Sequence, residues 1–252
     1  MSTQPEFIAG IYNFCDAWCE RCLFTSRCRS FQLQTATGLA SPQNSGDALV
    51  QQLTEALSLT KKYVENLTRS HELFDSNAPI TDQIQALEAN ASGLDPTQQQ
   101  SISTVAGEYL RQTGIWLSVE KDLLEQAGQR QIQEVELGLK TQEEAMPGLH
   151  ALKDAWEMIR WYRTLIPVKT QSVLRSMTDI AETPKLTDYF LGKVKLILVS
   201  IDRSILAWQT IMGHFPEKID DLLDSMALLS RLRRELESLF PNARAFNRPG
   251  LD

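Results

Sequence analysis

The sequence lacks the features that would assign it to several familiar classes. It has no uncharged apolar run long enough to cross a membrane, and its start has neither the basic residues nor the apolar stretch of an export signal. It also has no strand-like alternation, no repeat of fixed period, no Gly-rich phosphate loop and no Gly-x-Ser-x-Gly elbow. We therefore expect a cytoplasmic protein without a membrane span.

Basic residues are outnumbered. The chain has 25 Lys and Arg against 32 Asp and Glu, which gives a net charge of −7. Such a balance argues against a nucleic-acid-binding surface over much of the protein. A protein partner remains compatible with it, and the composition indicates neither that partner nor an oligomeric state.

Histidine is scarce, which limits the metal sites that a helical protein could build. None of the three histidines, His71, His150 and His214, follows a glutamate three residues earlier, so the Glu-x-x-His pairs of di-iron bundles are missing. His150, Asp154 and Glu157 do share one helix face by their spacing, and they could bind a cation or transfer a proton. The alternative is an ordinary exposed face with i,i+4 pairs.

Helical periodicity dominates the rest of the chain and predicts an all-α protein. Apolar residues recur at alternating steps of three and four from residue 47 to residue 239, as in an antiparallel bundle of about five or six helices. Asp95-Pro96, Thr183-Pro184 and Pro216 are expected to open helices, and Pro241 to stop the last one. Breaks or kinks are expected at Gly128, Pro147-Gly148 and Pro167.

The same patterns divide the chain into three parts. Residues 1–31 form a four-cysteine metal-binding helix and loop, residues 32–46 a linker rich in Gly, Ser, Pro and Asn, and residues 47–252 the bundle. Within the bundle we expect a helix along the seam of residues 50–74 and a short one over residues 80–91.

All four cysteines lie within fourteen residues, in the spacing C-x3-C-x2-C-x5-C. They are Cys15, Cys19, Cys22 and Cys28, and no cysteine follows them. In the reducing cytoplasm such a cluster more often binds metal than forms disulfides. Four thiolates complete one site, so we expect these residues to be the ligands of a single metal centre.

Helical phase favours a larger centre over a single ion. Residues from Pro5 to Cys22 have helical spacing, which places Cys15, Cys19 and Cys22 on one face. Positions i and i+7 are separated by about 10.5 Å along a helix axis. Three thiolates spread this far suit a [4Fe-4S] cluster better than a zinc ion, which draws its sulfurs closer together.

The stretch from Cys19 to Cys28 resembles known iron–sulfur segments. Cys-Glu-Arg-Cys-Leu-Phe-Thr-Ser-Arg-Cys is similar to the C-x2-C-x5-C staple of RecB-like nucleases, and the spacing also occurs in WhiB-type iron–sulfur regulators. In both families a fourth cysteine comes from elsewhere, a role that Cys15 would fill. The resemblance covers ten residues and implies a cluster, not a nuclease, because the strand-borne Asp…Glu-x-Lys core is missing.

Three functions follow as hypotheses. The first is an iron–sulfur protein with a structural, redox-sensing or electron-transfer role. The second is a helical scaffold that is stapled by zinc and binds a protein partner. The third is an enzyme with a bundle pocket near His150, Asp154 and Glu157.

Overall fold

The computed structural model describes residues 6–36, 96–177 and 184–252. These residues belong to two compact units. The N-terminal unit contains described residues 6–36 together with 248–252, and the bundle unit contains the others. Every regular element in the described ranges is helical, which confirms the predicted all-α class for this part of the chain.

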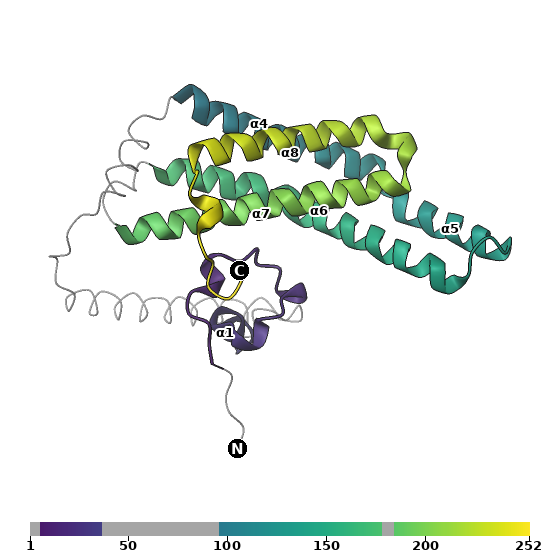
Figure 1. Ribbon diagram of the computed structural model, residues 1–252, viewed down its shortest axis with the longest axis horizontal. Helices are drawn as coiled ribbons and strands as arrows, with labels where there is room; N and C mark the ends of the chain where they lie inside the picture. The colour runs from purple at the N-terminus through teal and green to yellow at the C-terminus, as the bar shows by residue number, and fades with distance from the viewer. Residues whose placement is uncertain (1–5, 37–95, 178–183) are drawn as a thin grey trace, which may run out of the picture. The chain divides into compact units, whose positions relative to one another are not determined.

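The described residues of the bundle unit form five α-helices (Figure 1). They are α4 (Pro96–Val119), α5 (Leu123–Glu136), α6 (Gln142–Ser176), α7 (Pro184–His214) and α8 (Ile219–Leu239). Helices α4, α6, α7 and α8 lie side by side, and α5 packs against α6. Within the described ranges, no helix combines the length and the apolarity that crossing a bilayer requires.

Contacts between distant residues show that neighbouring helices run antiparallel. Ser103 near the start of α4 donates to Gln171 near the end of α6, over 2.9 Å. At the other end of α4, Glu120 pairs with Lys218, just before α8, over 2.6 Å. The antiparallel arrangement predicted from the sequence is therefore the one that the described helices adopt.

The core of the bundle unit is apolar and rich in tryptophan. Trp116 of α4 lies against Trp156 of α6 and Trp208 of α7, with ring centroids 5.5 Å and 4.9 Å away. Trp208 and the neighbouring aliphatic side chains of α7, such as Ile201 and Ile211, are fully buried. Burial of each such side chain contributes about 1.5–3 kcal/mol, so this unit has an adequate core of its own.

Helix boundaries confirm the start and stop signals of the sequence. As predicted, α4 begins at Pro96, α7 begins at Pro184 and α8 ends before Pro241. Pro216 opens a single 3₁₀ turn, Pro216–Lys218, and α8 follows directly. Proline at a first helical position loses no hydrogen bond, which explains why helices begin at these prolines.

The breaks predicted at Gly128 and Pro147 were wrong, and Pro167, predicted to kink or end its helix, does not end it. Gly128 lies within α5, and the chain turns instead at residues 120–122. Pro147 and Pro167 both lie within α6. A capping box of Thr141 and Glu144 fixes the start of that helix. Buried residues on both sides of Pro167 provide packing that outweighs the missing hydrogen bond.

The predicted division of the chain also needs correction. Residues 29–36 form helix α1 (Arg29–Ala36), so the linker predicted for 32–46 begins inside a helix. Outside the described residues lie the rest of the predicted linker, the seam over residues 50–74 with His71, and the helix expected over residues 80–91. Residues 248–252, assigned from the sequence to the bundle, belong to the N-terminal unit.

The N-terminal unit has short turns where an α-helix was predicted. Residues 5–22 were expected to be helical, yet described residues 6–22 contain only the 3₁₀ turns Ile11–Asn13 and Cys19–Arg21. A third turn, Thr25–Arg27, precedes α1. Periodicity misled here because a cysteine-rich aromatic segment produces an apolar stripe whether or not it is helical.

Gly250 in the C-terminal turn of the N-terminal unit provides a test of its packing. Its φ is +71°, and an added Cβ would lie 2.8 Å from Cδ1 of Ile8. Gly250→Ala should destabilise this unit by about 1–2 kcal/mol from the backbone alone, with the clash in addition. Hydrogen exchange of the Ile8 amide, which donates to the carbonyl of Arg27 over 3.1 Å, should be faster in the variant.

Gly128→Ala is the matched control. No atom lies within 4 Å of its added Cβ, and the residue is inside a helix. This variant should raise the global stability by about 0.5–1 kcal/mol in denaturant unfolding and leave exchange at Ile8 unchanged. Equal exchange at Ile8 in the Gly250→Ala variant and the parent would contradict the packing described here.

Candidate metal centre

The four cysteines lie at the turns of the N-terminal unit. Cys19 begins the turn Cys19–Arg21 and Cys22 closes it, with the Cys22 amide donating to the Cys19 carbonyl over 3.2 Å. Cys28 closes the turn Thr25–Arg27 in the same way, over 3.3 Å. Cys15 follows the first turn, and its thiol donates to the carbonyl of Tyr12. Tight turns thus replace the helix face that was predicted to align three of the thiols.

Backbone amides two residues further on act on two of the sulfur atoms. The amide of Phe24 donates to Sγ of Cys22 over 3.4 Å. The amide of Ala17 acts on the thiol of Cys15 and lowers its pKa. Such bonds favour a negatively charged sulfur and are also a means of tuning a bound metal. The repeated i,i+2 geometry is therefore suited to holding thiolates.

Ala17 adopts an uncommon backbone conformation between the first two cysteines. Its φ of +58° makes it the single non-glycine residue with a positive φ in the described chain. A left-handed residue other than glycine costs about 1–2 kcal/mol. Asp16 supports the turn by accepting a hydrogen bond from the Trp18 amide over 3.2 Å. Strain at this position goes together with an amide directed at a candidate ligand, a combination typical of functional sites.

The thiols are close enough to influence one another. Burial raises the pKa of Cys19, and the charges of Cys15, Cys22 and Cys28 raise it further. Burial also raises the pKa of Cys15, an effect that the Ala17 amide partly offsets and that nearby Asp16 reinforces. Mutual repulsion of this kind between half-buried thiolates is relieved when a cation binds among them.

The described residues do not bring these side chains to ligand spacing. Nowhere in the described ranges do three or more His, Cys, Asp or Glu side chains lie close enough together to hold a metal ion. All four cysteines are free, half-buried thiols. The donor types and the turns fit a thiolate centre, but the sulfurs would have to move closer together to share one.

The second predicted site is exposed on the surface of α6. His150 and Asp154 are exposed and Glu157 is half-buried, and Glu157 lies 4.0 Å from Lys153 in an i,i+4 pair. This is the ordinary helix face that the sequence offered as the alternative to a cation or catalytic site.

The backbone donors Ala17 and Phe24 were not foreseen from the sequence. An amide has no residue-type signature, so only the turn geometry reveals it. A weak signal was present in the short spacing from Cys19 to Cys22, which a tight turn satisfies as well as a helix does.

Comparisons with protein-family models, with curated proteins and with solved structures find no match to this chain.

The raised thiol pKa values predict a pH profile for the metal-free protein. Alkylation by iodoacetamide requires the thiolate, so the rates at Cys15 and Cys19 should rise at higher pH than in the denatured chain. Mass spectrometry of labelled peptides gives the pH midpoint of the alkylation rate for each cysteine. It also gives the plateau rate at high pH, which reports how accessible the thiol is to the reagent. Midpoints at or below those of the denatured chain would contradict the environment described for these thiols.

Proposed function

We propose that the N-terminal unit is a cysteine-liganded metal centre, with Cys15, Cys19, Cys22 and Cys28 as its ligands. The observation that supports it most is the gathering of all four thiols within fourteen residues, where the Phe24 amide donates to Sγ of Cys22 and the Ala17 amide lowers the pKa of Cys15. The same amides would stabilise the thiolates on which either zinc or an iron–sulfur cluster depends.

The second support for the proposal is the small amount of apolar surface that the described residues of this unit bury. Ile11 and Phe14, 2% and 8% exposed, are the buried apolar residues among the described residues of this unit. Each contributes about 1.5–3 kcal/mol by burial. A structural zinc site contributes about 10–16 kcal/mol in small peptides at neutral pH. Metal binding would therefore outweigh the burial of these two side chains.

A [4Fe-4S] cluster is the first candidate for the centre. Its support is the C-x2-C-x5-C spacing from Cys19 to Cys28, which resembles iron–sulfur staples, and the half-buried aromatic side chains of Trp18 and Phe24 beside the ligands. Such a cluster supplies one-electron chemistry when bound, with a potential that hydrogen bonds to its sulfurs and its burial adjust. A redox-sensing or electron-transfer role would follow.

Zinc is the second candidate, and one structural observation favours it. The preference for a larger cluster came from placing Cys15 and Cys22 on a continuous helix, and residues 6–22 have no such helix. Turns can bring four thiolates to one small ion in a way that an intact helix cannot. With zinc the centre would be purely structural, and the bundle would be the part that binds a partner.

Metal analysis of protein purified without air tests the proposal. A cluster predicts about four iron atoms per chain with broad visible absorption. A structural ion predicts about one colourless zinc per chain. Each single Cys→Ser variant should lose most of the metal. The control His150→Ala/Asp154→Asn should keep all of it, because those residues lie on α6 in the bundle unit. Metal-free protein from cells supplied with iron and zinc would refute the proposal.

Removal of the metal should affect the two units differently. A chelator should leave the far-ultraviolet circular dichroism of the bundle almost unchanged, because that unit has its own apolar core. Trypsin should then cleave faster after Arg21, Arg27 and Arg29 of the N-terminal unit. Equal cleavage with and without metal would contradict a stapling role.

A further inference from the structure

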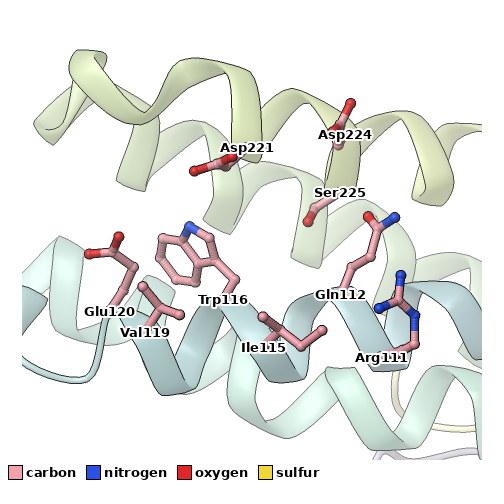
Figure 2. Close-up of a pocket in the computed structure, with 9 residues that line it drawn as sticks. All are labelled: Arg111, Gln112, Ile115, Trp116, Val119, Glu120, Asp221, Asp224 and Ser225. Atoms are coloured by element: carbon pink, nitrogen blue, oxygen red, sulfur yellow. The ribbon is translucent and has the colours of Figure 1, made fainter.

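The face between α4 and α8 of the bundle unit has an open groove (Figure 2). It consists of two adjoining pockets of about 270 and 320 Å³ that share Gln112 and Asp224. On α8 the lining positions 221, 224, 228 and 231 fall on one helix face. Ten residues of helix correspond to about 15 Å. That length accommodates about four or five residues of extended peptide.

Charge in the groove is negative and uncompensated. The cations at its rim already have carboxylate partners: Arg111 pairs with Glu108, whose pKa Arg111 holds at about 2, and Arg231 pairs with Glu235. Lys218 likewise pairs with Glu120.

Asp221 and Asp224 are exposed on α8, and neither forms an ion pair with any residue of the described chain. Two carboxylates one helical turn apart attract a cationic side chain.

A buried donor in the same groove is also unsatisfied. Trp116 is 8% exposed, and its indole N–H has no hydrogen-bond partner. Figure 2 shows the indole nitrogen turned toward α8, on the side where Asp221 lies. An unpaired buried donor destabilises the site, and a ligand that brings an acceptor would remove that penalty.

Apolar side chains of α4 complete the wall. Ile115 and Val119 line the groove and are 52% and 69% exposed. They offer a surface for the aliphatic stem of a long side chain or for a neighbouring apolar residue. The groove thus presents anionic, apolar and donor groups together.

We propose that this groove binds an extended basic segment of a partner protein. A lysine or arginine side chain pairs with Asp221 and Asp224, apolar atoms cover Ile115 and Val119, and a backbone carbonyl accepts the hydrogen bond of Trp116. A small polyamine would satisfy the carboxylates alone, because it has no carbonyl oxygen. The proposal rests only on residues of the bundle unit and is independent of the metal centre.

The test is a titration of the full chain with the blocked peptide acetyl-Leu-Arg-Leu-Lys-amide, followed by NMR. The indole N–H resonance of Trp116, assigned by its loss in Trp116→Phe, should shift in a saturable way as the N–H gains an acceptor. Asp221→Asn and Asp224→Asn should each weaken binding about fivefold, as expected for the loss of one exposed ion pair.

Asp220→Asn is the matched control, since Asp220 is exposed, adjacent to Asp221 and outside the groove. It removes the same charge and should weaken binding less than about twofold. Three outcomes would overturn the proposal: an equal effect of Asp220→Asn, an unmoved Trp116 resonance, or binding of 1,4-diaminobutane as tight as that of the peptide.

Discussion

Among the described residues of the N-terminal unit, the scarcity of buried apolar surface is the constraint from which their organisation follows. These residues bury two apolar side chains, Ile11 and Phe14, and so gain little from the hydrophobic effect. Its described residues are held instead by tight turns and by main-chain hydrogen bonds such as that from Ile8 to Arg27. Segments that bury so little apolar surface are generally completed by a cross-link, and four thiols at the turns offer one.

The bundle unit, in contrast, is held together by a large apolar core. Its helices bury a continuous core that includes the packed rings of Trp116, Trp156 and Trp208. Because that core needs no cross-link, the bundle can expose features that stability does not require. The groove between α4 and α8, with two unpaired carboxylates and an unsatisfied indole N–H, is such a feature.

The sequence predicted the fold class and those boundaries that local chemistry determines. Helices α4 and α7 begin at Pro96 and Pro184 as predicted, because the preference for proline at a first helical position depends only on the geometry of one turn. Gly128 and Pro147 do not interrupt their helices because tertiary burial outweighs their intrinsic cost, and burial depends on contacts that a single sequence does not reveal. The apolar stripe of the N-terminal segment was likewise taken for a helix.

For the candidate site, residue identity was predictable and conformation was not. The cysteines stood out by their spacing, whereas the amides of Ala17 and Phe24 have no signature in the sequence. The groove was equally hidden, because Trp116 and Asp221 are far apart in the chain and meet only through the packing of α4 on α8. Asp221 alone resembles an acidic residue that stabilises a helix start.

X-ray absorption spectroscopy of the full chain, purified without air, identifies the atoms that ligate the metal. Four cysteine ligands predict a metal whose first shell contains only sulfur, at about 2.3 Å in the case of zinc. Iron–iron scattering would identify a cluster. A first shell of nitrogen or oxygen at about 2.0–2.2 Å would contradict the account, because the cysteines would then not be the ligands.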